Sequence, residues 1–546
     1  MKPVHQSKDL FKGAFILMAA ALITKILSAV YRIPFQNIVG DIGFYIYQQV
    51  YPFYGIAIVL ATTGFPVVIS KLYAEHHEKG DSEKARQLLF ISYVFLQLFG
   101  LICFLFLYIG SYQIALWMGD TKLVILLKVV SVVFLTFPVV STLRGYFQGS
   151  GEMLPTALSQ IVEQLIRVAT IIFLAYLFTK KGYSLYLIGG GAMFGSITGS
   201  IVSAILLFMF LWFRKEWKMV TFDPLRLGGM FSGASWIFKA LALQGLAICI
   251  SGMMMIFIQL ADSMNLYSLL LSGGLEKETA KGLKGIFDRG QPLIQLGMVV
   301  SSSMSLSLVP LITSERLKES SDFLSDKVRL ALQISIVVGA GATAGLWSIV
   351  EPTNKMLFET ADGSSVLGVL SLVILLSSII STITAILQGL GKLVFPALII
   401  LTGFPVKYAL NMALVPPYGT MGAAIATIIT LSLVCIILTI QLSKALPFHL
   451  LTKRFAMAIT AASLAMVLTL KLFMYATGGI YQYIGSERIA AAAQSLGAVM
   501  VGGVIFLFII LRSAVFREEE LALFPFGSKL ILFLPKEEGR KNVEKN

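Results

Sequence analysis

The sequence has few charged residues for its length. Of its 546 residues, 13% are charged and 57% are hydrophobic, whereas an ordinary soluble domain carries about 25% charged residues. Runs of apolar residues follow one another along almost the whole chain, and about 20 such residues are enough to cross a bilayer. This composition excludes a soluble globular protein and predicts an all-α, polytopic membrane protein.

Cysteine and histidine are also scarce. The three cysteines, Cys103, Cys249 and Cys435, lie far apart inside apolar runs, so they are interpreted as small core residues and not as disulfide or metal ligands. Of the four histidines, His76 and His77 stand together in the charged stretch "AEHHEKGD", which is typical of a solvated loop. No metal site and no cofactor are expected; an ion gradient or the membrane potential is left as the source of energy.

Fourteen transmembrane helices are predicted. They run over 11–33, 45–73, 88–112, 121–146, 153–179, 184–213, 229–260, 285–313, 327–350, 364–388, 392–414, 418–444, 451–476 and 488–513. An even number of spans leaves both termini on one side, and most of the 43 Lys and Arg residues fall on that side. The positive-inside rule then places both termini in the cytoplasm, with the chain in the cytoplasmic membrane. The net charge of +14 is spread over short loops, which suits anionic lipids and not a nucleic acid.

One motif occurs twice, 240 residues apart. "TLRGYFQGSGEMLP" (141–154) and "TAILQGLGKLVFP" (384–396) each stand between apolar runs. Gly149 and Gly151 correspond to Gly389 and Gly391, and these glycines suit either a tight turn or a conformational hinge. Six predicted helices separate the two copies, so both copies have the same orientation.

Parallel repeats predict two six-helix lobes about an axis along the membrane normal, with a cavity between them. The expected divisions are an N-lobe (1–220), a C-lobe (221–447), two further helices (448–513) and a cytoplasmic tail (514–546). Within "GGGAMFGSITGS" (189–200), glycines recur every four residues on one helix face. This spacing favours close helix packing.

Basic residues inside the predicted spans carry most of the functional information, because an ionisable group at membrane depth must face a cavity or a partner. They are Lys25, Arg32, Lys71, Lys128, Arg167, Lys239, Lys407 and Lys471. Among acids within the spans, Glu163 is the clear one, and it stands four residues before Arg167. The two are predicted to form an ion pair, structural or gating, and Asp288 is a further candidate for such a pair or gate.

Four cationic residues are predicted to bind substrate in the cavity. Lys25 lies deep in the first span, Arg32 shares its face seven residues later, Lys239 lies in the corresponding helix of the second repeat, and Arg289 opens the eighth span. Arg32, near the predicted end of its span, could instead only snorkel to the interface. A cavity lined by Lys and Arg attracts an anion, and phosphate or pyrophosphate suits these groups best.

Several stretches resemble the polysaccharide biosynthesis/SpoVB-like family of the multidrug/oligosaccharidyl-lipid/polysaccharide (MOP) exporter superfamily, which also contains the MurJ-type lipid II flippases. They are "RGYFQGSGEMLPTALSQIVEQLIR" (144–167), "GFPVVISKLYAE" (64–75) and "FDRGQP" (287–292), together with the spacing of Lys25 and Arg32. The resemblance implies a two-lobed flippase that moves an undecaprenyl-pyrophosphate-linked saccharide, lipid II first of all, by alternating access.

The resemblance also implies roles for single residues. Lys25, Arg32 and Arg289 match cationic cavity positions on helices 1 and 8, while the family's helix 2 arginine is missing after Pro52 and Asp41 does not align with the family's acidic residue. The partners implied are the lipid-linked saccharide and membrane lipids, with a monomer as the expected state. The alternatives are a MATE-type cation-coupled drug antiporter or a flippase for another lipid-linked precursor. An enzyme is not expected, because clustered carboxylates and a sizeable extramembrane domain are lacking.

Overall fold

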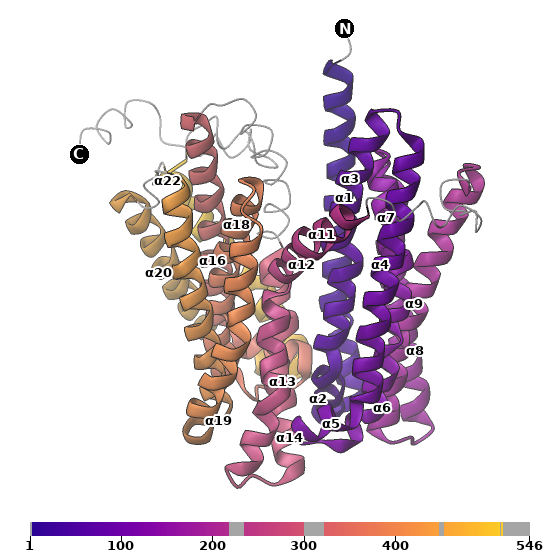
Figure 1. Ribbon diagram of the computed structural model, residues 1–546. Helices are drawn as coiled ribbons and strands as arrows, with labels where there is room; N and C mark the ends of the chain where they lie inside the picture. The colour runs from indigo at the N-terminus through magenta and orange to yellow at the C-terminus, as the bar shows by residue number, and fades with distance from the viewer. Residues whose placement is uncertain (1–2, 218–233, 300–320, 447–451, 514, 517–546) are drawn as a thin grey trace, which may run out of the picture. The chain divides into compact units, whose positions relative to one another are not determined.

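The computed structural model describes residues 3–217, 234–299, 321–446, 452–513 and 515–516. All regular secondary structure in these residues is helical, as Figure 1 shows, and the predicted all-α membrane class is confirmed. The chain divides into two compact units, one of Met1–Val299 with Leu387–Leu438 and the other of Val300–Ile386 with Thr439–Asn546. These units differ in membership from the lobes expected from the repeat, and the lobe boundaries stay a prediction.

The first unit begins with long helices separated by short turns. They are α1 (Pro3–Val30), α2 (Arg32–Val59), η1 (Leu60–Gly64), α3 (Phe65–Glu78), α4 (Ser82–Ile109), α5 (Ser111–Trp117), η2 (Thr121–Leu123), α6 (Val124–Ser131), α7 (Val133–Gly149), α8 (Met153–Lys180) and α9 (Leu185–Phe213). Large apolar side chains such as Phe106, Phe173 and Trp212 are exposed on these helices. A lipid-facing surface requires such side chains.

The first membrane helix is longer than the sequence suggested. The helical path continues through Arg32 to Val39 and breaks only at Gly40, where φ is +69°. Pro34 cannot donate a backbone hydrogen bond, so it interrupts the ladder near Tyr31 without ending the helix. The predicted end of this span at residue 33 is therefore wrong, and Arg32 lies well inside the helix.

The segment between the predicted spans 229–260 and 285–313 was expected to be a loop, but most of it is helical. After α11 (Ser235–Ala240), η5 (Leu241–Gly245) and α12 (Leu246–Gly252), the chain bends at Met253 and α13 (Met254–Ser272) continues the helical path, with α14 (Lys277–Asp288) behind it. Figure 1 shows α11 and α12 inclined to α13. Asp262 and Asn265, which fall in the predicted loop, are buried within α13.

The rest of the first unit consists of the helical residues 290–299, the end of α18 (Leu372–Gly389) and most of α19 (Val394–Ala445). Gly419 has a φ of +57° and separates α19 into two helical segments, next to Pro416 and Pro417. A glycine accepts this left-handed conformation without a steric penalty. The predicted spans 392–414 and 418–444 therefore meet at this break.

The two copies of the repeated motif form the same turn. Gly151 and Gly391 have φ angles of +81° and +79°. Gly151 N–H donates to Gln148 O at 3.1 Å, and Gly391 N–H donates to Gln388 O at 2.9 Å. The residue after each glycine donates back to the carbonyl five positions earlier, which completes a Schellman motif. The repeat thus encodes a helix end that only glycine forms without strain.

The glycine face of α9 packs closely on α8, as predicted. A Cβ on Gly199 would lie 2.7 Å from Glu163 O, and one on Gly195 would lie 2.9 Å from Arg167 O. Small residues let two helix backbones approach to this distance. This packing places the backbones of Glu163 and Arg167 directly against Gly199 and Gly195 of α9.

The second unit contains α16 (Ser321–Phe358), α17 (Ser364–Leu370), most of α18, the end of α19, α20 (Lys453–Ala476), α21 (Ile480–Tyr483) and α22 (Glu487–Arg512). Its core joins side chains of α16, α20 and α22, among them Ile334, Met466 and Phe506. In Figure 1, α20 and α22 run side by side.

Twelve stretches of the described residues are long and apolar enough to cross a membrane. Two of them, Phe15–Glu78 and Val394–Ala445, each hold two predicted spans. Ser235–Gly252 and Met254–Ser272 together cover one predicted span. The remaining predicted span, 285–313, is described only as far as Val299, and almost all of the tail lies outside the described residues.

Candidate functional site: a buried cluster of charged residues

The first unit holds charged side chains in its interior. One centre is an ion pair between α2 and the residue that follows α14. Arg289 donates from Nε to Asp41 Oδ1 at 2.9 Å and from Nη2 to both carboxylate oxygens at 2.6 and 2.7 Å. Gln36 Nε2 donates to the same Asp41 Oδ1 at 2.9 Å. Arg289 is only 1% exposed, so this two-pronged bond holds a buried guanidinium in place.

The helix α14 brings two more charges to this region. Lys284 and Asp288 are four residues apart and share its buried face, where Lys284 Nζ donates to both Asp288 oxygens at 2.6 and 2.7 Å. Gly285 lies between them and touches the Asp41 backbone carbonyl so closely that no Cβ would fit. A residue without a side chain is therefore needed where α14 meets α2.

Asp288 lies outside the twelve apolar stretches. Burial raises the pKa of Asp288 to about 6, and the charge and hydrogen bonds of Lys284 oppose this rise. Asp262 raises this pKa further and Arg32 lowers it. Gly285 of α14 contacts the Asp41 backbone of α2, so the charged residues of these two helices lie close together.

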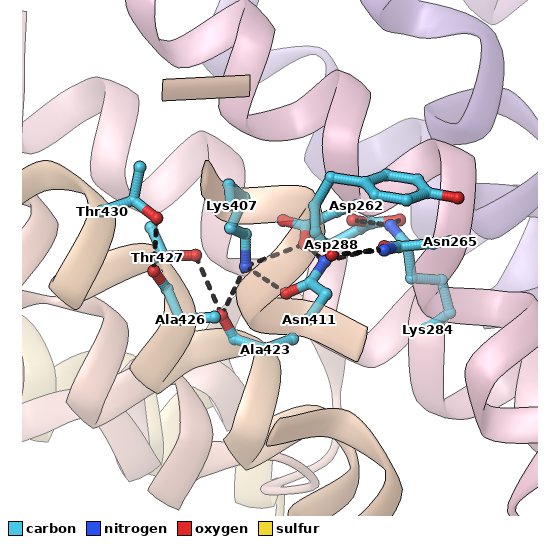
Figure 2. A network of polar contacts seen from close by, with 11 residues as sticks. Asp262, Asn265, Lys284, Asp288, Lys407, Asn411, Ala423, Ala426, Thr427 and Thr430 are labelled. Atoms are coloured by element: carbon cyan, nitrogen blue, oxygen red, sulfur yellow. Dashed lines mark hydrogen bonds and ion pairs between the residues drawn. The ribbon is translucent and has the colours of Figure 1, made fainter. Parts of the chain in front are cut away.

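A third centre surrounds Lys407 of α19. Lys407 Nζ donates to Asn411 Oδ1 at 2.9 Å and to Ala423 O at 2.6 Å, and it lies 2.9 Å from Asp262 Oδ1. Asn411 Nδ2 donates in turn to Asp262 Oδ1 and to Asn265 Oδ1, both at 2.9 Å. Figure 2 shows this network reaching from α19 to Asp262 and Asn265 of α13, beside Lys284 and Asp288.

The fourth centre is a tyrosine cage around Arg167 of α8. Arg167 Nη2 donates to the hydroxyls of Tyr31 at 2.8 Å and Tyr47 at 3.0 Å. Its Cζ lies 4.1 Å from the ring centroid of Tyr54 and 5.1 Å from that of Tyr31. Stacking on aromatic faces stabilises a guanidinium where no carboxylate is present.

Arg32 lies next to this cage, with its Cζ 4.2 Å above the ring of Tyr51. It is 2% exposed, so it does not snorkel to the membrane surface. Within the described residues no carboxylate lies within ion-pair distance of Arg32 or Arg167. Several buried polar atoms of the cage also lack hydrogen-bond partners there: Arg32 Nε, Arg167 Nε, Gln164 Nε2 and the Tyr54 hydroxyl.

The predicted ion pair between Glu163 and Arg167 is wrong. Glu163 Oε2 accepts from Arg144 Nη2 at 2.7 Å, and Arg144 also donates to Ser159, Ser203 and the Ala61 carbonyl. Spacing along α8 placed Glu163 and Arg167 on one face, but α7 supplies a guanidinium that reaches the carboxylate better. Glu163 therefore joins α7 to α8, while Arg167 turns to the tyrosines.

The remaining predicted cations lie in different surroundings. Lys25 is half-buried on α1, and Lys239 is exposed on α11. Lys71 and Lys128 are exposed, and Lys471 is exposed beside Trp347 in the second unit. No ion pair forms at Lys25 or Lys239 within the described ranges. That Lys25, Lys239 and Arg289 share one cavity stays a prediction.

Sequence reasoning missed three charged residues of the cluster, Asp41, Asp262 and Lys284, because it counted all three in loops. Asp288 was predicted as a candidate for an ion pair or a gate, and it pairs with Lys284. Five tyrosines lie within residues 31–54, and four of them, Tyr31, Tyr47, Tyr51 and Tyr54, surround the two arginines. This clustering was the available sequence signal. Together the four centres contain five cations (Arg32, Arg167, Lys284, Arg289 and Lys407) and three carboxylates (Asp41, Asp262 and Asp288).

Comparison with known proteins agrees with this architecture. Residues 10–315 match the family described as polysaccharide biosynthesis protein. The chain is 45% identical to an uncharacterized membrane protein of Bacillus subtilis, YabM, over 97% of both chains. It is 25% identical to the lipid II flippase MurJ of the same organism, over 92% of this chain and 95% of MurJ. It is also 25% identical to the stage V sporulation protein B of that organism, over 95% and 98% of the two chains.

Solved structures share the fold. A lipid II flippase MurJ in an inward closed conformation matches with a TM-score of 0.63 at 16% identity, covering 91% of this chain and 98% of that one. A MATE family transporter of the MOP superfamily in an inward-facing conformation matches with a TM-score of 0.60 at 16% identity, covering 82% and 98%. The chain is thus a polytopic membrane protein with the fold shared by MurJ and MATE transporters. It belongs to the polysaccharide biosynthesis protein family.

Proposed function

We propose that this protein is a flippase for undecaprenyl-pyrophosphate-linked saccharides, with lipid II as the first candidate substrate. It moves them across the cytoplasmic membrane by alternating access, with both termini in the cytoplasm. The observation that carries the proposal is the pair of buried arginines, Arg32 and Arg167, which have tyrosine neighbours and no carboxylate partner in the described residues. A buried charge without a counter-ion costs several kcal/mol by order of magnitude, so an anionic ligand would relieve this cost.

The chemistry of the cage favours a phosphate. Arginine binds phosphate through parallel N–H donors. The unpartnered donors of Arg32, Arg167, Gln164 and Tyr54 would find acceptors on phosphate oxygens. A pyrophosphate offers more such oxygens than a carboxylate does, and the Nε atoms of both arginines have no hydrogen-bond partner in the described residues.

The hydrogen-bond and ion-pair partners of the buried carboxylates make a drug cation an unsuitable substrate. A cation-coupled drug antiporter needs a carboxylate that is free to receive a cation. Here Asp41, Asp262, Asp288 and Glu163 are held by Arg289, Lys407, Lys284 and Arg144. Asp120, which is also buried, accepts hydrogen bonds from the hydroxyls of Tyr45 and Tyr186 and from the Lys122 N–H. The electrostatic balance of the cluster therefore supports an anionic headgroup.

The printed names of the relatives bear on the choice of saccharide. Lipid II is the substrate named for MurJ, and MurJ and this chain align over most of both lengths. The relative with 45% identity carries no substrate in its name. Another undecaprenyl-linked precursor is therefore the alternative substrate within the same proposal.

The test is transport in liposomes. Purified protein is reconstituted and offered fluorescent lipid II, a teichoic-type undecaprenyl-linked precursor and a drug cation side by side. We expect transport of at least one lipid-linked saccharide, and its loss in Arg167→Gln protein that is equally well folded. Transport of the drug cation alone would overturn the proposal.

A further inference from the structure

The ammonium group of Lys407 has all its hydrogen bonds satisfied by oxygen atoms. An ammonium has three donors and no acceptor, and Lys407 Nζ meets three oxygens at 2.6 to 2.9 Å: Ala423 O, Asn411 Oδ1 and Asp262 Oδ1. Lys407 and Asn411 are fully buried, and Asp262 is 2% exposed. The three oxygens thus surround a positive charge that water does not reach.

Contacts other than those with Lys407 hold these oxygens in place. Asn411 Nδ2 donates to Asp262 Oδ1 and Asn265 Oδ1, which turns the amide oxygen of Asn411 toward Lys407. Ala423 belongs to the segment of α19 after the Gly419 break, and Thr427 Oγ1 donates to the same Ala423 carbonyl at 3.0 Å. Figure 2 shows the oxygens converging from α13 and from both segments of α19.

A carboxylate, an amide oxygen and a backbone carbonyl are the ligands that hard metal cations prefer. The lysine ammonium is itself a compact point charge, so it can stand where such a cation would stand. Asp262 supplies a second oxygen, Oδ2, which is buried and has no hydrogen-bond partner in the described part of the chain. The oxygen set therefore has one more ligand than the ammonium uses.

We propose that Lys407 is a tethered cation that permanently occupies a monovalent-cation site formed by Asp262, Asn411 and Ala423. A free Na⁺ or K⁺ can enter and leave such a site during a transport cycle, but a lysine side chain cannot leave it. The transport cycle therefore does not bind or release a metal cation at this position. This inference does not depend on which lipid-linked saccharide the protein moves.

Removing the tethered charge tests the proposal, because the oxygens then remain without their cation. The thermal stability of the full-length protein in detergent is measured in choline chloride, NaCl and KCl at equal ionic strength. Wild-type protein should have the same Tm in all three salts. Lys407→Ala and Lys407→Ser should unfold at a lower temperature in choline, and Na⁺ or K⁺ should raise their Tm by several degrees in a saturable way, as binding to the folded state requires.

Two controls separate this site from general salt effects. A double variant, Lys407→Ala with Asp262→Asn, lacks the anionic ligand and should lose the response to Na⁺ and K⁺. Lys471→Ala removes an exposed lysine of a different span and should behave like the wild type. A saturable, cation-specific rise in the Tm of wild-type protein would overturn the proposal. So would the absence of any such rise in both Lys407 variants, including failure of both to fold in any of the salts.

Discussion

Arg289 binds both oxygens of the Asp41 carboxylate across 248 residues of sequence. The bond joins α2, one residue after its break at Gly40, to the residue that follows α14. Asp41 follows directly on the helix break at Gly40, and Gly285 lets α14 approach its backbone. A helix break, a close glycine contact and an ion pair therefore meet at one point.

Removing either partner of this pair should weaken the protein and its transport. We expect Arg289→Gln or Asp41→Asn to lower the unfolding free energy by about 2 kcal/mol, in the range for hydrogen bonds to charged groups. The double variant should lose clearly less than the sum, because the second substitution removes a group that has already lost its partner. Denaturant unfolding in detergent measures all three, and strict additivity would show that the pair contributes no coupling energy.

Arg289→Lys should retain part of the transport activity. Its charge survives while the two-pronged bond to Asp41 is lost. Complementation of cells that lack lipid II flippase activity, with protein levels checked by blot, gives the readout. Activity of Arg289→Lys no better than that of Arg289→Gln would show that the geometry of the bond matters and its charge does not.

Gly285→Ala tests whether the close approach of α14 positions Asp41. A Cβ at residue 285 meets the Asp41 carbonyl, so the helix must shift; forced overpacking costs about 1 to 3 kcal/mol, and transport should fall. Gly282 lies three residues earlier in the same helix with nothing within 4 Å of its would-be Cβ. Gly282→Ala should be neutral, or stabilise by roughly 0.5 to 1 kcal/mol because alanine is the better helix former. Equal loss in both variants would exclude a specific role for residue 285.

Arg167 should matter for transport more than any surface arginine. Arg167→Gln removes the charge from the tyrosine cage, and we expect lipid-linked saccharide transport to fall at least tenfold. Arg488 is a matched control, because its pair with Glu359 is exposed on the second unit. Exposed pairs contribute about 0 to 1 kcal/mol, so Arg488→Gln should transport normally. Normal transport by correctly folded Arg167→Gln would remove the main support for a phosphate site in the cage.

Substitutions of Lys25 test whether a positive charge at this position of α1 attracts the substrate. Lys25→Glu should be worse than Lys25→Ala, because it adds repulsion of a pyrophosphate to the loss of attraction. The same complementation assay, with lipid II flipping as the essential function, ranks the two variants. If Lys25→Glu complements as well as wild type, the substrate does not pass close to this position.

The lengths of the apolar runs and the residues that end helices were enough to predict most of the helices of this protein from the sequence alone. A span needs only its own apolar residues to be recognisable, so all spans that fall within the described residues were placed with errors mainly at their ends. The turns after Gln148 and Gln388 were readable because glycine at positive φ is a local requirement. The glycine face of α9 was readable for a similar reason, since its spacing lies on one helix.

The charge partners were decided by the tertiary structure alone. Glu163 and Arg167 are four apart on one helix, yet the first pairs with Arg144 and the second with Tyr31 and Tyr47. Lys407 finds Asp262 across 145 residues and Arg289 finds Asp41 across 248. Inside a membrane a charge takes the partner that best replaces its lost water, wherever in the chain that partner lies. Sequence spacing measures distance along one helix, and the choice of partner depends on which helices pack against it.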